Sequence, residues 1–431
     1  MKTKYITITQ ALDLVRDSSS IVTGLGAAGA HGFMDRLHNL HGKVKDVTIT
    51  NCLPMSDYAF FGKEYAETYN INGWFYCPPM RKAHENGNIS VVPNHLHLAG
   101  KKRLAHSTPN IYVGAATPPD RHGFVSLSVS NAYERRMIDA ADIVILEINP
   151  NFPRTFGDVE LHIRDVDYLV EMDYPVPVLP DIPSNELDIT IGNYVAEYIN
   201  DGDCIQLGIG GIPNAVAQAL EQKKDLGIHT EMLTSGIMKL AKTGVVTGAK
   251  KTQHQGKIVA TFILGTKELY DFAHDNPSVL MMDGNYVNDP GVIGRNDNQV
   301  SINTTLEIDL VGQCASETIG HRQFSGTGGQ ADTVTGAQRA KNGRSFIALY
   351  STAMVKGPDG ERVRVSKIVP TLKPGAVVSL SRNDVDFVVT EYGVAALRGT
   401  SVKDRVERLI AIAHPDYREE LAASARELMF W

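Results

Sequence analysis

Two stretches of the chain repeat the same order of features, and this internal repeat is the strongest constraint on the fold. The first stretch covers residues 6–40 and the second covers residues 189–220. Each contains a segment with helical spacing, then a short apolar strand that ends in glycine, then a second helix. That order is the β-turn-α unit of a parallel sheet. The repeat therefore predicts an α/β protein with two similar open-sheet domains.

The repeat extends by one further strand in each copy. Residues 46–52 align with residues 225–231, so Cys52 stands in the first copy where Glu231 stands in the second. A proline-rich segment, residues 175–183, lies between the copies and is typical of a domain linker. We place the boundary at about residue 185, with an N-terminal domain of residues 1–185 and a C-terminal domain of residues 186–431.

Composition and charge exclude several classes of protein. The 431 residues are 43% hydrophobic and 21% charged, which is typical of a folded globular chain. The formal net charge of -7 disfavours a nucleic-acid partner. No apolar run is long enough to span a membrane or to serve as a secretory signal, and the four cysteines are widely spaced without a CxxC. We expect a cytoplasmic protein that contacts no membrane and has no thiolate metal site.

A glycine-rich turn at residues 208–213 follows the second apolar strand and precedes a helix. Backbone N–H groups at such a turn can hold a phosphate, a pyrophosphate or a developing oxyanion. The turn is not a P-loop, because no Gly-Lys-Ser/Thr follows, and Pro213 replaces the last glycine of the dinucleotide-binding fingerprint. The structural alternative is a turn that needs glycine only for packing.

Glu231 lies at the end of the next predicted strand, where an open parallel sheet places side chains that face a ligand. In a dinucleotide-binding domain this acid would hydrogen-bond a ribose. Facing an oxyanion hole, it could be a covalent nucleophile. An exposed glutamate without a function is the third interpretation.

Other motifs carry weaker signals. A second glycine-rich loop at residues 325–332 suggests backbone close to a ligand, or a plain surface loop. Thr390 could cap a short helix with Glu391 in its first turn, which is a structural role. His95, His97 and His106 suggest a metal, but no HExxH or carboxylate at ligand spacing accompanies them. No G-x-S-x-G occurs, so a serine hydrolase is not predicted either.

Together, several motifs in order along the chain resemble the acetyl-CoA hydrolase/transferase family, specifically its 4-hydroxybutyrate and butyryl-CoA:acetate CoA-transferases. The motifs are residues 117–123, 208–213, 229–232, 303–307, 325–330, 391–393 and 397–399. The resemblance runs essentially from end to end. It implies two α/β domains of the CoA-transferase type, in agreement with the internal repeat.

The resemblance also implies roles for individual residues. Glu231 would be the nucleophile, and Asn288 would lie near the reacting carbonyl. The glycine turn would bind CoA and supply oxyanion-hole amides, with Gly210 and Gly211 as the candidate donors. The predicted CoA contacts are Gly208, Ile209, Gly210, Gly211, Ile212, Leu306, Gly329 and Lys356. Ser235 departs from the acidic residue expected in the closest relatives, which leaves the acyl preference open.

The implied reaction is a ping-pong transfer of CoA between a short-chain acyl-CoA, such as 4-hydroxybutyryl-CoA or butyryl-CoA, and acetate. It would pass through a glutamyl-CoA thioester and need no cofactor beyond the CoA substrate. We expect a homo-oligomer, namely a dimer. A thioesterase that uses the same Glu231 and a non-catalytic ligand-sensing module are the alternatives, and an oxidoreductase is disfavoured by Pro213.

Overall fold

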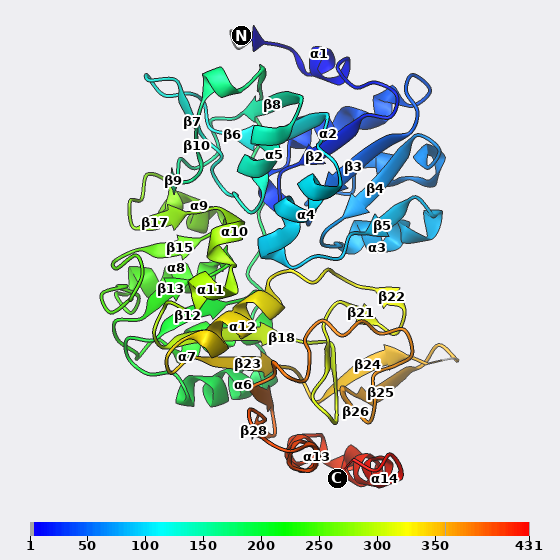
Figure 1. The fold of residues 1–431 in the computed structure, drawn as a ribbon, viewed down its shortest axis with the longest axis vertical. Coiled ribbons are helices and arrows are strands. Elements are labelled where there is room, and N and C mark those ends of the chain that lie inside the picture. Colours follow the sequence, from blue (N-terminus) through cyan, green and yellow to red (C-terminus); the bar gives the residue numbers. More distant parts are fainter. Residues whose placement is uncertain (1–3, 358, 431) are drawn as a thin grey trace.

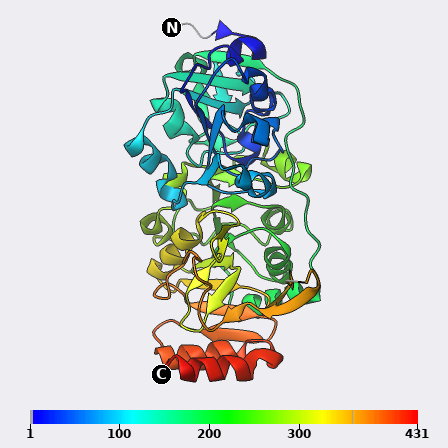
Figure 2. The ribbon, with the colours of Figure 1, turned by 90° about the vertical axis from the view of Figure 1, so that its right-hand side faces the viewer.

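The computed structural model describes residues 4–357 and 359–430, which form two α/β units stacked along the long axis of the molecule (Figures 1 and 2). Each unit is built around one open sheet. The chain begins at one end of the long axis and ends, with α13 (Val402–Ala411) and α14 (Arg418–Glu427), at the other. No helix of the described residues is long and apolar enough to cross a membrane.

The first sheet has eight strands in the order β1-β11-β8-β6-β2-β3-β4-β5, and all of its pairings are parallel. Its strands are β1 (Lys4–Tyr5), β2 (Ser20–Thr23), β3 (Val47–Asn51), β4 (Tyr69–Gly73), β5 (Ile89–Val91), β6 (Ile111–Ala116), β8 (Ile143–Ile148) and β11 (Tyr168–Glu171). Its helices are α1 (Ile8–Leu12), α2 (His31–Arg36), α3 (Pro78–Ala83), α4 (Ala99–His106) and α5 (Glu134–Ala140). The central strands β2, β3, β6 and β8 are almost fully buried, as expected for a parallel sheet covered by helices.

The second sheet has nine strands in the order β28-β27-β23-β18-β12-β13-β15-β17-β9. Its strands are β9 (Phe156–Gly157), β12 (Cys204–Leu207), β13 (Gly227–His229), β15 (Ile258–Ala260), β17 (Val279–Met281), β18 (Gln299–Thr304), β23 (Arg344–Ala348), β27 (Phe387–Thr390) and β28 (Gly393–Ala396). Its helices are α6 (Glu186–Glu197), α7 (Gly211–Ala219), α8 (Ser235–Lys242), α9 (Lys267–Ala273), α10 (Gly284–Val287), α11 (Pro290–Ile293) and α12 (Gln330–Arg339). Only the pairing of β27 with β28 is antiparallel.

These two sheets confirm the predicted fold class and the internal repeat. The repeated units supply β2 and β3 in the first sheet and β12 and β13 in the second, and each pair is adjacent and parallel. Cys52 directly follows β3, and Glu231 follows β13 by two residues. The two aligned positions therefore lie at corresponding carboxyl ends of central strands.

The two units share one hydrophobic core. The largest cluster of buried apolar side chains contains Cys52 and Trp74 from the first unit together with Met232 and Phe262 from the second. The short strand β9 precedes residue 185 but pairs with β17 of the second sheet. The predicted boundary near residue 185 falls between β11 and α6 and stays a prediction.

The prediction of a helix beginning at Thr390 is wrong. Residues 391 and 392 form the two-residue turn of the β27–β28 hairpin. Gly393 has φ of +134°, a conformation that favours glycine, and the hydroxyl of Thr390 donates to the carbonyl of Ile412 instead of capping a helix. Glu391 accepts hydrogen bonds from the backbone N–H and the hydroxyl of Ser351 at 2.9 and 2.6 Å. Glu391 therefore has a structural role, because it links the β27–β28 hairpin to Ser351, which follows β23.

Candidate active site

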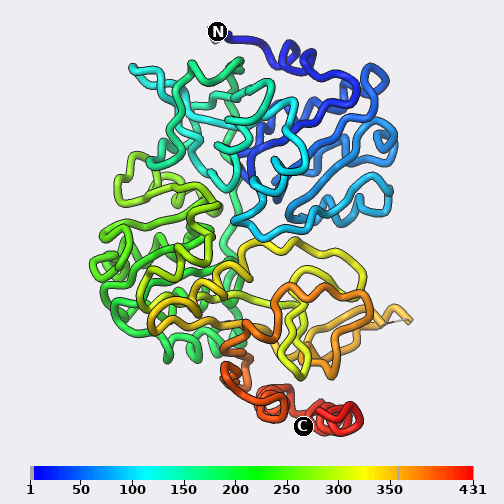
Figure 3. Tube along the Cα trace, in the orientation of Figure 1, coloured from blue at the N-terminus to red at the C-terminus, as the bar shows by residue number. Residues whose placement is uncertain are grey.

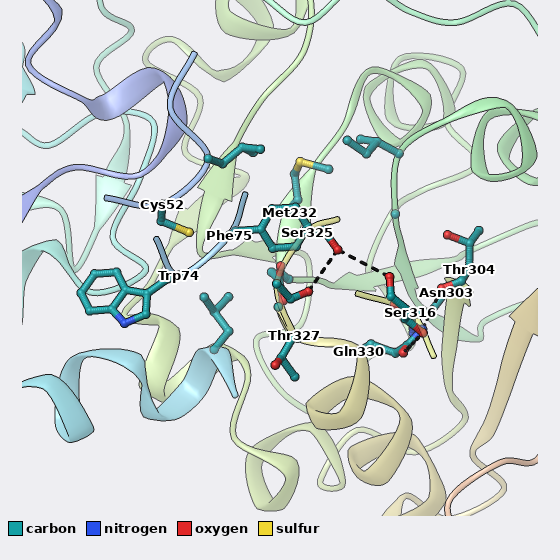
Figure 4. Close-up of a pocket in the computed structure, with 18 of the residues that line it drawn as sticks. Cys52, Trp74, Phe75, Met232, Asn303, Thr304, Ser316, Ser325, Thr327 and Gln330 are labelled. Carbon is teal, nitrogen blue, oxygen red and sulfur yellow. Dashed lines mark hydrogen bonds between the residues drawn. The ribbon is translucent and has the colours of Figure 1, made fainter. Parts of the chain in front are cut away.

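A cavity of about 420 Å³ lies between the two units and is lined by residues of both (Figure 4). We call it the interdomain cavity. Glu231 lines it from the second unit and Cys52 lines it from the first. Burial raises the pKa of the Cys52 thiol well above its usual value, and the negative charges of Glu134 and Glu231 act in the same direction. The two corresponding positions of the repeat therefore face one cavity, with a neutral thiol on one side and a carboxylate on the other.

The two sides of the interdomain cavity differ in polarity. The first unit contributes a mainly apolar wall that includes Leu25, Leu53, Trp74, Phe75, Leu96 and Ala99. The second contributes most of the polar lining, including Gln206, Asn303, Thr304, Thr305, Ser316 and Gln330. Figure 4 shows Cys52 and Trp74 at one end and Thr304, Asn303, Ser316 and Gln330 at the other. A substrate with one apolar end and one polar, amide-rich end fits this division.

The Glu231 side chain is held by a neutral donor. Asn288 Nδ2 donates to Glu231 Oε2 at 2.7 Å, and none of the ion pairs among the described residues includes this carboxylate. Burial raises the pKa of Glu231 to about 7, the hydrogen bond from Asn288 lowers it, and the charge of Asp332 raises it. A carboxylate that is poorly solvated and partly ionised near neutral pH is typical of a catalytic group.

The backbone around Glu231 fixes the direction of its side chain. The carbonyl oxygen of Glu231 accepts hydrogen bonds from the N–H groups of Thr261 and Phe262 at 3.0 and 3.1 Å. The next residues form β14 (Met232–Leu233), which pairs in parallel with β16 (Phe262–Ile263). Both sides of the nucleophile candidate are therefore held by main-chain hydrogen bonds to a neighbouring strand.

The second glycine-rich loop closes over the Glu231 carboxylate. A β-carbon on Gly329 would lie 1.7 Å from Glu231 Oε2 and 2.2 Å from Asn288 Nδ2, so any side chain there would displace the Glu231 carboxylate and the Asn288 amide. A β-carbon on Gly326 would lie 2.1 Å from the carbonyl oxygen of Trp74 in the other unit. Both glycines are required by contacts within the protein itself. In Figure 3 the yellow segment near residue 325 runs directly beneath the blue N-terminal unit.

The first glycine turn connects β12 to α7 beside the cavity. Gly208 and Ile209 line the interdomain cavity, whereas Gly210 lines a smaller neighbouring cavity of about 190 Å³. Gly210 has φ of +112°, and a β-carbon on Gly211 would lie 2.4 Å from Asp188 Oδ2, so both positions need glycine. Within residues 4–357 and 359–430, no acceptor faces the N–H groups of Ile209, Gly210 and Gly211. These donors remain available to an anion.

The structure brings most, but not all, of the predicted site residues together. Glu231, Gly208, Ile209, Leu306 and Gly329 line the interdomain cavity, and Asn288 reaches it through its hydrogen bond to Glu231. The lining does not include Gly210, Gly211, Ile212 or Lys356. Ile212 is buried in α7, and Lys356 ends β24 (Thr352–Lys356) on an exposed hairpin with β25 (Arg362–Ser366). The roles assigned to these residues stay predictions.

Two features of the site were missed from the sequence. Among the residues that the structure describes, Arg81 is the one cationic side chain in the lining of the interdomain cavity, and its guanidinium carbon lies 4.0 Å from the ring centre of Phe324. His97 Nδ1 lies 2.8 Å from Asp332 Oδ1, across the two units. In both pairs the partners are far apart in sequence, and no local motif links them. Among the described residues, no group of three or more His, Cys, Asp or Glu could hold a metal ion.

The chain belongs to the acetyl-CoA hydrolase/transferase family. Residues 2–180 match the N-terminal domain of that family and residues 265–425 match its C-terminal domain. The family resemblance predicted from the motifs is therefore confirmed.

Three individual proteins illustrate the similarity. The chain is 44% identical to the succinyl-CoA:cyclohexane-1-carboxylate CoA transferase of Geobacter metallireducens, over 91% of this chain and 87% of that one. It is 41% identical to the 4-hydroxybutyrate coenzyme A transferase of Clostridium kluyveri, over 97% and 96% of the two chains. The crystal structure of RipA from Yersinia pestis superposes with a TM-score of 0.91 at 33% identity and covers 99% of this chain and 98% of RipA.

Replacing Glu231 by glutamine should raise the melting temperature at pH 8 but hardly change it at pH 5. An unfolded glutamate has a pKa of about 4.3, whereas burial raises the pKa of folded Glu231 to about 7. Stability linked to the protonated acid is complete below the unfolded pKa and is lost as the pH rises through about 7. At pH 8 the native protein carries a buried charge that the variant lacks.

Calorimetry of both proteins at the two pH values checks this expectation, with an increase at pH 8 on the order of 1–3 °C. The matched control is Glu221→Gln, because Glu221 is exposed and should show no pH-dependent difference. Equal shifts of the Glu231→Gln variant at pH 5 and pH 8 would contradict the assignment of a buried charge.

Proposed function

We propose that this protein is a CoA-transferase that moves CoA between a short-chain acyl-CoA and a carboxylate such as acetate, with Glu231 as the covalent nucleophile. The observation that carries the proposal is the Glu231 carboxylate itself. It is half-buried in the lining of the interdomain cavity, it is held by the neutral amide of Asn288, and Gly329 closes over it. Family membership and the names of the relatives support the same reaction.

The reaction proceeds by four displacements at carbonyl carbons. The ionised Glu231 attacks the thioester carbonyl of the acyl-CoA, and CoA leaves as its thiolate, which gives an acyl-glutamyl anhydride. The thiolate attacks the glutamyl carbonyl and expels the first carboxylate, which leaves a glutamyl-CoA thioester. The second carboxylate attacks that thioester and expels the thiolate, which then attacks the new acyl carbonyl and frees Glu231. No electron or net proton transfer is required.

The neutral donors around Glu231 suit these steps. The Asn288 amide donates to the glutamate oxygen that carries negative charge when the thiolate attacks the glutamyl carbon. The N–H groups of Gly210 and Gly211 are the candidate donors for the oxyanion on the acyl side. A preorganised donor at such an oxyanion is worth roughly 3–4 kcal/mol of transition-state stabilisation.

The polarity of the interdomain cavity supports the orientation of the substrates. The apolar wall of the first unit suits the acyl chain, and the polar wall of the second suits the amides of the pantetheine arm. Leu306, Gly329 and Lys356 remain the proposed CoA contacts together with the turn at residues 208–212. We expect butyryl-CoA or 4-hydroxybutyryl-CoA as donor, CoA as the only cofactor-like group, and a cytoplasmic homodimer.

Incubation with butyryl-CoA alone should attach CoA to Glu231. Without an acceptor, the first half-reaction stops at the glutamyl-CoA thioester. Mass spectrometry of an acid-quenched digest should find the mass of CoA on the peptide that contains residue 231. The Glu231→Gln variant should give no adduct, and the Cys52→Ala variant should give the adduct and keep most of its activity, because the thiol only lines the cavity.

An adduct on Glu391, or no adduct from an active enzyme, would overturn the proposal. Loss of activity in Cys52→Ala comparable to that in Glu231→Ala would show that the first copy of the repeat also carries chemistry. Free CoA and butyrate formed without acceptor at the full turnover rate would identify a hydrolase instead.

The Glu231→Asp variant should lose transfer activity steeply and favour hydrolysis. The carboxylate is kept but withdrawn by one methylene, so it misses the attack position by on the order of 1 Å, which costs about 100-fold in rate. The shorter side chain leaves room for water beside the thioester, while the backbone donors of the turn are unchanged. Parallel assays of free CoA release and acetyl-CoA formation measure both outcomes. Undiminished transfer would count against Glu231 as a positioned nucleophile.

A further inference from the structure

A short segment of the first unit holds the glycine loop that covers Glu231. The N–H of Leu96 donates to the carbonyl of Gly328 at 3.1 Å, and the N–H of His97 donates to Asp332 Oδ2 at 3.1 Å. The His97 ring adds a third contact, with Nδ1 2.8 Å from Asp332 Oδ1. Nδ1 donates to this carboxylate oxygen when it carries the ring proton, because the oxygen of a carboxylate accepts. Asp332 is 2% exposed, so its charge depends on these donors for solvation.

Asp332, which accepts the hydrogen bonds of His97, is three residues away from Gly329, which contacts Glu231. Asp332 lies in the first turn of α12, and the helix begins immediately after Gly329. Gly329 in turn is pressed against the Glu231 carboxylate and the Asn288 amide. A shift of Asp332 therefore moves the residue that covers the nucleophile.

The charges in this region form one connected group. The titratable side chains that face Asp332 are His97 at 2.8 Å, His95 at 3.8 Å and Glu231, whose pKa the charge of Asp332 raises. Glu317 faces His95 from the segment before β22 (Arg322–Gln323). On the side of the first unit, Glu134 and Glu231 raise the pKa of the Cys52 thiol, and burial keeps this thiol neutral. Asp332 is thus the negative charge through which the histidines can influence Glu231.

We propose that His97 is a positioning residue: from the first unit, through Asp332, it holds the glycine loop against Glu231 of the second. The inference rests on the proposed function, because it concerns the geometry of the same nucleophile. Formation of the active site then requires both units, since one supplies the nucleophile and the other fixes the loop that covers it.

Three substitutions separate positioning from a general loss of structure. His97→Ala leaves Asp332 without its side-chain donor, so the loop is held less firmly over Glu231 and kcat should fall roughly 10- to 100-fold. His97→Asn restores a donor near the position of Nδ1 and should recover most of kcat. Asp332→Asn removes the charge but keeps an amide toward His97, so the acid limb should move to lower pH by about one unit.

Recovery of kcat in His97→Asn, together with the downward shift of the acid limb in Asp332→Asn, is the signature of the proposal, because a general loss of structure would produce neither. His106→Ala, an exposed histidine on α4, is the control and should leave both quantities unchanged. Circular dichroism melts accompany each variant. If His97→Ala does not fold, the proposal is tested by kcat of His97→Asn and by the acid limb of Asp332→Asn.

The failure of this inference differs from the failure of the proposed function. Wild-type protein that forms no CoA adduct on residue 231 overturns the function. Wild-type protein that forms the adduct, while His97→Ala and Asp332→Asn keep its rates and its acid limb, overturns only the role of His97.

Discussion

The proposed chemistry of this protein depends on one half-buried carboxylate, that of Glu231, which has no cationic partner among the described residues. Glu231 lies at the carboxyl end of β13, and its Oε2 accepts a hydrogen bond from the neutral amide of Asn288. The charged group that shifts its pKa is another carboxylate, that of Asp332. Water would solvate such a group better than this site does. The surrounding packing must therefore offset the cost of holding it, and the shared hydrophobic core of the two units provides that packing.

The internal repeat explains how such a site can form. Two sheets of the same construction meet with the ends of their central strands on one cavity, so the position after β3 faces the position after β13. In the first copy that position is Cys52, a neutral and buried thiol, and the side chains around it form an apolar wall. In the second copy it is Glu231. A duplicated architecture thus gives one half that carries the proposed nucleophile and one half that forms the apolar wall of the cavity.

The sequence was sufficient for the features that are local or periodic and insufficient for those formed by distant contacts. The strand-glycine-helix repeat predicted both sheets, and the spacing from the glycine turn to Glu231 left two functional interpretations that only the family motifs separated. Asn288 was predicted from the resemblance, because nothing in its own neighbourhood indicates that it reaches Glu231. Contacts such as His97 with Asp332 or Arg81 with Phe324 join segments that meet only after folding. The helix expected at Thr390 failed because Gly393 permits a two-residue hairpin turn that local capping preferences do not reveal.

The absence of a cation beside Glu231, within the residues that the structure describes, is consistent with the direction in which charge moves during CoA transfer. In the proposed reaction, the negative charge starts on Glu231, passes to the CoA thiolate, and then to the departing carboxylate, while the glutamyl group becomes a neutral anhydride and a neutral thioester. A fixed cation at Glu231 would stabilise the starting carboxylate more than either covalent intermediate, and would lower its nucleophilicity by lowering its pKa. A neutral amide such as that of Asn288 can donate to the oxygen whether it is a carboxylate, a developing oxyanion or a thioester carbonyl. The Asn288 amide can therefore stabilise each state of the glutamyl group without strongly favouring one of them.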